Sequence, residues 1–132
     1  MTLSEEIKRK IEEEYIEFEH LQYGDLDKNK RKELGAFFTP PVLTIKMLEK
    51  LKSLDDDIVD PTMGAGGLLA AAIIAGADPK RIYGIELDET IYNNAVKRLG
   101  ALGVPSKNLI LGDVLKQESW DELEEIRYDN NK

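Results

Sequence analysis

Short apolar runs alternate with helical patterns along most of the chain, and this alternation is the feature that most limits the possible folds. The runs occupy residues 58–60, 81–87 and 109–111, and each ends at a polar or glycine-containing turn. Apolar residues at helical spacing follow the first two runs, and a helix start signal follows the third. Strands that alternate with helices form parallel sheets joined by right-handed crossovers, so the sequence predicts an α/β layered fold with three parallel strands.

A helix is predicted at the start of the chain. Thr2 and Glu5 have the spacing of a capping box, and apolar residues continue at helical spacing to about residue 22. Residues 24–33 have no apolar period and are interpreted as a polar linker. The basic residues within 28–32 are interpreted as a solvated loop, with a phosphate contact as the less favoured alternative.

Further helices are predicted after the linker. Thr39 is expected to cap the first of them, with prolines in its first turn. A helix rich in small residues is expected at 66–75, and Asp88 is expected to cap the next one. A second capping box at 119–122 predicts a last helix that ends at about Arg127.

Length and composition restrict the possible classes of protein. The 132 residues predict a single domain at 34–132, preceded by the helix at 1–23 and the linker. There are no cysteines and one histidine, which excludes disulfides and thiolate metal sites. No apolar run approaches the roughly 18 residues of a membrane span, and the charged start lacks a signal-peptide core, so we expect a cytoplasmic protein. The net charge of −8 argues against an extended nucleic-acid-binding surface on this chain alone.

The loop at 60–67 carries the first chemical signal. Gly64 and Gly66 allow turn conformations and close approach of a ligand, and the next helix begins with free amides. The dinucleotide fingerprint is absent, since Leu69 stands where its third glycine would be. Asp60 would repel a pyrophosphate but suits a ligand with an ammonium and a sulfonium group. The charge pattern therefore favours S-adenosylmethionine over a nicotinamide dinucleotide.

Two more acidic residues follow the second and third predicted strands. Glu86 is predicted to accept hydrogen bonds from both ribose hydroxyls of a nucleoside, the alternative being a surface glutamate. Asp113 is predicted to accept one from the adenine amino group, the alternative being a residue that caps a turn. Leu87 and Val114 would then lie on either side of the adenine ring. In open α/β sheets such loops converge at the carboxyl ends of the strands.

These motifs together resemble those of adenine-specific (N6) DNA methyltransferases of restriction-modification systems, over roughly residues 34–115. Residues 35–41 (Gly-Ala-Phe-Phe-Thr-Pro-Pro) are similar to the element that precedes the glycine loop in that family, and 60–69 are similar to the loop itself. The resemblance implies a Rossmann-like class I methyltransferase fold and S-adenosylmethionine as cofactor. It also implies that Phe38 and Thr39 contact the methionine carboxylate, with Asp60 and Pro61 near the amino group.

The family's catalytic element, Asn/Asp-Pro-Pro followed by an aromatic residue, does not occur in this sequence. We therefore predict no catalytic residue here, and expect the chain to act on DNA only through a complete enzyme. In the family's strand order the strand at 58–60 would form an open edge, which predicts self-association or a second polypeptide that completes the sheet.

Two other functions are compatible with the sequence. The chain could be a non-catalytic module that binds S-adenosylmethionine or pairs with a methyltransferase subunit. It could also be a methyltransferase for RNA, protein or a small molecule, although the Phe-Phe-Thr-Pro-Pro element favours the DNA-directed class.

Overall fold

The computed structural model of the protein describes residues 1–23 and 39–132. The predicted linker at 24–33, its basic cluster and Phe38 therefore lie outside the described residues. The helices and strands follow one another in the order α1 (Glu5–Tyr23), α3 (Pro41–Glu49), β1 (Ile58–Asp60), α4 (Gly67–Ile74), β2 (Ile82–Glu86), α5 (Glu89–Ala101), β3 (Leu109–Leu111) and α6 (Gln117–Asn130). Short 3-10 turns at Pro79–Arg81 and Ser106–Asn108 lead into β2 and β3.

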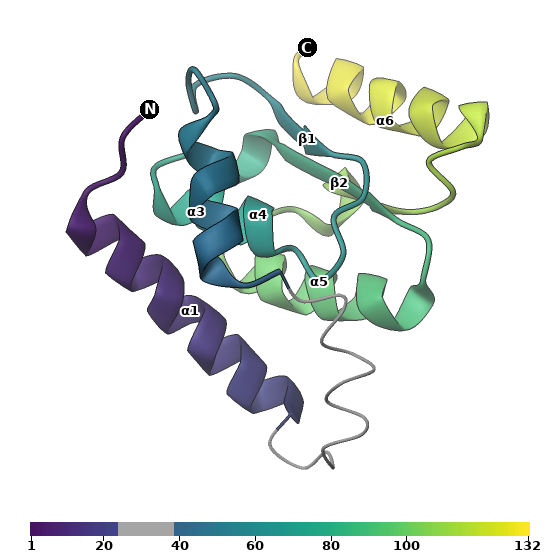
Figure 1. Ribbon diagram of the computed structural model, residues 1–132. Helices are drawn as coiled ribbons and strands as arrows, with labels where there is room; N and C mark the ends of the chain where they lie inside the picture. The colour runs from purple at the N-terminus through teal and green to yellow at the C-terminus, as the bar shows by residue number, and fades with distance from the viewer. Residues whose placement is uncertain (24–38) are drawn as a thin grey trace.

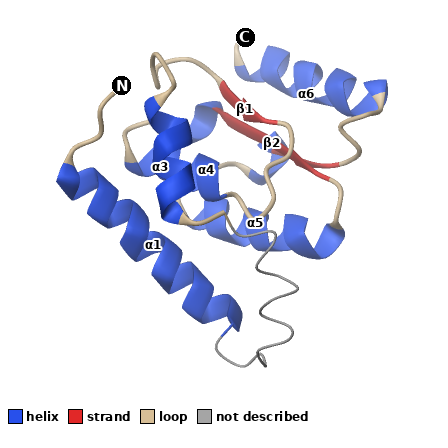
Figure 2. Cartoon of the chain, in the orientation of Figure 1, coloured by secondary structure: helices blue, strands red, loops and turns tan. Residues whose placement is uncertain are grey.

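The three strands form one parallel sheet in the order β1-β2-β3. Ile58 pairs with Ile82 across the first ladder, and Gly84 pairs with Leu109 across the second. Helices lie on both faces, with α6 on one side and α3, α4 and α5 on the other (Figures 1 and 2). The predicted partial Rossmann-like fold with an N-terminal helix is confirmed.

Residues of β2 alternate between two apolar clusters, as the period of a strand requires. Ile82 packs with α1, α3, α4 and α5, whereas Tyr83 and Ile85 pack with Leu123 of α6. All four of these side chains are essentially inaccessible to solvent. Burial on both faces explains why β2 reads as an almost continuous apolar run. Within the described ranges, no helix combines the length and the apolar composition needed to cross a membrane.

Three predicted helix starts were wrong, and each error has a local cause. Ser4 rather than Thr2 caps α1, since its hydroxyl oxygen accepts from Ile7 N at 3.2 Å. Pro40, without a side-chain cap, precedes α3 in place of Thr39. The last helix, α6, begins before Ser119, which lies buried within its first turn. By contrast, Asp88 caps α5 as predicted, because its Oδ1 accepts from Ile91 N at 3.0 Å.

The carboxylate of Asp57 connects the segment before β1 with the start of β2 and with α6. It accepts from Arg81 Nε at 2.9 Å and from Arg127 Nε at 3.0 Å, and only 8% of its side chain is exposed. Burial acts to raise the pKa of Asp57, but the hydrogen bonds and positive charges of the two arginines outweigh it, so the pKa lies below its ordinary value of 3.8. The charged form therefore stabilises the fold.

We predict that Asp57→Asn lowers the free energy of unfolding at neutral pH by about 1–2 kcal/mol, because it removes the negative charge that the two arginines share and replaces one of the two acceptor oxygens with a donor. The contribution of Asp57 is present above pH 3.8 and is lost as the pH falls below that value. Urea unfolding of both proteins across this range should therefore show the difference shrinking at acid pH. Asp129→Asn, at an exposed ion pair with Lys132, is the control and should change little. An equal loss in both variants would contradict this role for Asp57.

Candidate functional site

The loop at residues 60–67 passes from β1 into α4 through two left-handed glycines. Gly64 has φ 56° and Gly66 has φ 88°, a region that L side chains rarely adopt. Gly66 precedes the first residue of α4, and its N–H donates to Met63 O at 2.9 Å. A Cβ on Gly66 would lie 3.0 Å from Leu99 Cδ1, inside the core. The structure thus confirms that these glycines serve a tight turn at the start of a helix.

Met63 fixes this loop against the neighbouring strand. Its N–H donates to Ile85 O at 3.0 Å, and its side chain is 4% exposed. A Cβ on Gly84 of β2 would collide with Met63 Sδ. The glycine in the middle of β2 therefore leaves room for the loop to fold back over the strand.

Glu86 at the end of β2 joins two loops. Its Oε1 accepts from Gly64 N at 3.1 Å, and its Oε2 accepts from Asp88 N at 2.8 Å. Each carboxylate oxygen has two lone pairs, so both oxygens keep one acceptor position for a ligand. The sequence predicted Glu86 as a ligand contact but did not predict that it organises the loops around it.

Asp60 is the last residue of β1, at the same end of the sheet as Glu86. Its Oδ1 accepts from Thr62 N at 3.1 Å. Burial raises the pKa of the Asp60 carboxyl; the hydrogen bond from Thr62 lowers it, and the negative charge of Glu86 raises it further, with a net shift upward. A positive charge brought to this position would therefore stabilise the ionised carboxylate.

These residues line a pocket of about 390 Å³ at the carboxyl ends of β1 and β2. Among the residues that the structure describes, its lining contains two carboxylates and no basic side chain. The lining residues are Thr39, Met47, Asp60, Thr62, Met63, Gly64, Leu68 and Glu86.

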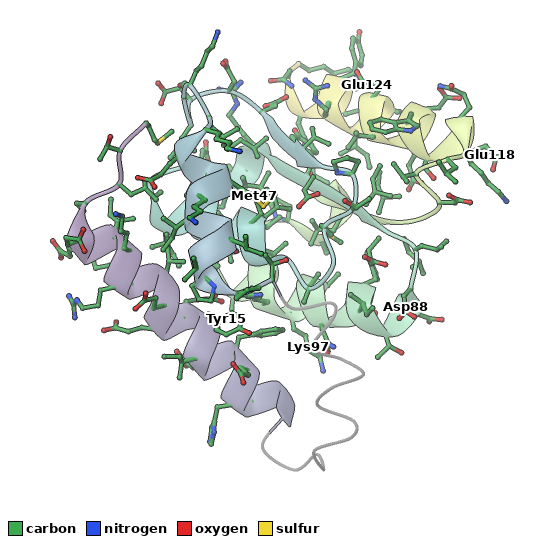
Figure 3. The ribbon with its side chains drawn as sticks, in the orientation of Figure 1. Tyr15, Met47, Asp88, Lys97, Glu118 and Glu124 are labelled. Carbon is green, nitrogen blue, oxygen red and sulfur yellow. The ribbon has the colours of Figure 1, made fainter. Side chains whose placement is uncertain are left out.

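Four of these lining residues were predicted from the sequence, and four were missed. Thr39, Asp60, Gly64 and Glu86 were predicted, and the structure brings them together. Three of the missed residues, Thr62, Met63 and Leu68, lie within the segment 60–69, and the fourth lies on α3. This fourth residue is Met47, whose side chain is labelled on α3 in Figure 3. It is 47% exposed.

The other predicted residues that the structure describes are not among those that line this pocket. Leu87 is 68% exposed beside Glu86. Asp113 Oδ1 accepts from Leu115 N at 2.9 Å, so this residue does cap a turn, which was the alternative interpretation. Val114 O accepts from Trp120 Nε1 at 2.8 Å, a contact that fixes the loop after β3. Pro61 and Gly66 belong to the glycine loop and shape its backbone.

A second pocket, of about 630 Å³, lies at the opposite ends of the strands. Its lining includes Lys80, Arg81 and Lys107, which lie in the two 3-10 turns that lead into β2 and β3. Ligands of open α/β sheets bind outside the carboxyl ends of the strands, so position favours the smaller, acidic pocket.

Comparisons with known proteins agree with this architecture. The fold and the glycine loop define a class I methyltransferase type of domain. The profile of the N-6 DNA methylase family matches residues 18–128, and the chain belongs to this family. The Type II methyltransferase M.NspV of Nostoc sp. is 32% identical over 94 residues, which are 69% of this chain and 19% of that protein. The chain thus spans about a fifth of the length of that relative. No solved structure matches the present chain.

We predict that Gly66→Ala destabilises the protein by about 1–3 kcal/mol, because the added Cβ meets both a left-handed backbone and the buried Leu99. Gly100→Ala is the matched control, since a Cβ there meets nothing within 4 Å and the residue lies in α5. The control should be neutral or slightly stabilising. Denaturant titrations of both variants measure this, and equal stability of the two would refute the strain assigned to Gly66.

Proposed function

We propose that this chain binds S-adenosylmethionine as the cofactor-binding portion of a site-specific adenine-N6 DNA methyltransferase. The observation that carries the proposal is the pocket at the carboxyl ends of β1 and β2, to whose lining residues 1–23 and 39–132 contribute two carboxylates and no basic side chain. S-adenosylmethionine supplies an activated methyl group and carries both an ammonium and a sulfonium charge. Membership of the N-6 DNA methylase family supports the same cofactor.

The electrostatics of the pocket separate this cofactor from other nucleotides. A pyrophosphate would bring negative charge to Asp60 and Glu86, and no cation among the described lining residues would compensate it. An ammonium group near Asp60 would instead offset the burial that raises the pKa of this carboxyl. The donor set therefore fits the methionine end of S-adenosylmethionine.

The remaining contacts follow the strand order. Glu86 retains one acceptor position on each oxygen, which suits the two ribose hydroxyls. The loops that follow β2 and β3 contain the remaining predicted contacts. We assign Asp113 to the adenine amino group, and Leu87 and Val114 to the two faces of the ring. On the other side Thr39, with the adjoining Phe38, would contact the methionine carboxylate.

Methyl transfer itself would need groups that this sequence does not contain. In adenine-specific DNA methyltransferases the Asn/Asp-Pro-Pro-aromatic element receives the target adenine. These 132 residues contain no such element. We therefore assign cofactor binding to this chain, and DNA recognition and catalysis to a complete enzyme. A non-catalytic S-adenosylmethionine-binding module is the alternative.

The unpaired side of β1 supports a proposal about partners. Within the described ranges β1 pairs only with β2, and Ile58 and Val59 are partly exposed. An open strand edge presents unpaired N–H and C=O groups to another chain. We propose that a second copy or a second polypeptide adds a strand there.

Sedimentation velocity over a range of concentrations tests this proposal for the isolated chain. We expect the sedimentation coefficient to rise with concentration, and the β1 amides to become protected from hydrogen exchange as it rises. A monomer at all concentrations, with β1 already protected, would contradict an open edge.

The cofactor assignment is tested by calorimetric titration of Glu86→Ala and Asp113→Ala with S-adenosylmethionine. Loss of a charge-assisted contact should cost about 1.5–3 kcal/mol in each variant, or about ten- to a hundredfold in affinity. Glu89→Ala, which removes an exposed acidic residue at the start of α5, is the control and should bind as the wild type does. Unchanged affinity in both site variants would overturn the assignment.

A further inference from the structure

A buried arginine connects the N-terminal helix to the body of the protein. Arg98 of α5 is 7% exposed, and Glu14 of α1 accepts from its Nε at 2.8 Å and from its Nη2 at 2.6 Å. The guanidinium also lies over the ring of Phe18, 4.2 Å from the centroid. Neither Arg98 nor Glu14 belongs to a motif recognised in the sequence. This bidentate pair bridges residues 84 positions apart.

The same guanidinium reaches the glycine loop. Arg98 Nη1 donates to Ala65 O at 3.4 Å, a long but charge-assisted hydrogen bond. A Cβ on Gly67, at the start of α4, would lie 3.7 Å from the same nitrogen. This side chain of α5 therefore contacts both α1 and the loop between β1 and α4, which lie near α5 in Figure 1.

This contact acts on the part of the loop that has the least ordinary backbone. Ala65 lies between Gly64 and Gly66, both of which have positive φ. Its carbonyl belongs to the peptide whose N–H, on Gly66, donates to Met63 O. Arg98 therefore holds one face of this peptide segment, while Glu86 holds Gly64 N from the pocket side.

Glu14 determines where the guanidinium lies. Its two oxygens take Nε and Nη2, which leaves Nη1 directed at Ala65 O. The planar fork of an arginine makes these contacts simultaneously, whereas a lysine ammonium in the same place would not span both partners.

From this geometry we propose that Arg98, oriented by Glu14, is a positioning residue for the cofactor-binding loop, and that α1 is thereby part of the cofactor-binding unit. The inference rests on the proposed function, since the consequence is tighter binding of S-adenosylmethionine. The arginine holds the loop backbone in the conformation that places Gly64 and Glu86 at the pocket.

The test uses the full chain with Arg98→Met, Arg98→Lys and Glu14→Gln, at a temperature where each variant is folded. Two quantities are measured, namely the affinity for S-adenosylmethionine by calorimetry and the exchange rates of the Gly64 and Gly66 amides by NMR without ligand. Arg98→Met and Arg98→Lys should weaken binding by about threefold to tenfold and speed exchange at both amides. Glu14→Gln should have a smaller effect in the same direction.

Arg9→Met is the matched control, because it removes an arginine from an exposed ion pair with Glu13 on α1. It should change neither quantity. If Arg98→Met fails to fold, Arg98→Lys still decides, since it retains the charge beside Glu14 but not the span to Ala65. Unchanged affinity in the folded Arg98 variants overturns the inference, whatever their stability.

The exchange measurement separates this inference from the proposed function. If the wild type does not bind S-adenosylmethionine, the proposed function fails. Faster exchange at Gly64 and Gly66 would still support the positioning of the loop by Arg98, and unchanged exchange would reject it.

Discussion

The carboxylate of Glu86 accepts one backbone hydrogen bond from each of two loops, and the candidate site depends on these two bonds. Parallel pairing of β1 with β2 brings the glycine loop beside the end of β2. Glu86 then fixes Gly64 N on one oxygen and Asp88 N on the other. Without this acceptor the part-buried Gly64 N–H would lose its partner, which is costly, whereas the exposed Asp88 N–H could bond to water instead. The residue proposed to hold the ribose is thus also the residue that shapes the pocket.

The negative charge at the pocket follows from the parallel pairing of β1 and β2. Asp60 and Glu86 lie on adjacent parallel strands that end at the same edge, so folding brings two carboxylates together. The raised pKa of Asp60 reflects its burial first and the proximity of Glu86 as a smaller cause. A site that concentrates negative charge in this way is matched to a cationic ligand. On the far side of the same loop, Arg98 is neutralised by Glu14 and donates to the backbone carbonyl of Ala65.

Sequence reasoning recovered the order of strands and helices because burial and periodicity are local signals. The run at 81–87 shows that β2 is buried on both faces, and Asp88 has the spacing to cap α5. Helix starts were less predictable where two hydroxyl residues competed, as with Thr2 and Ser4. Ser119 failed as a cap because α6 begins two residues earlier, which leaves the Ser119 side chain buried close to Gly112.

The site was predicted in part for a related reason. Glycines and strand-end acids are visible in the sequence, and four of the predicted residues do line the pocket. Contacts between distant segments are not visible. No local pattern links Glu14 with Arg98, or assigns Gly84 to the space needed by Met63. These pairings follow from tertiary packing alone.

We propose that a cationic methyl donor binds at the carboxyl ends of β1 and β2. An NMR titration of the full chain with S-adenosylmethionine tests it most directly, because each backbone amide reports its own position. We expect saturable shifts at Gly64, Gly66, Leu87 and Asp88, with little change at Lys80 and Lys107 in the opposite pocket. Shifts confined to that opposite pocket, or none at saturating ligand, would contradict the account.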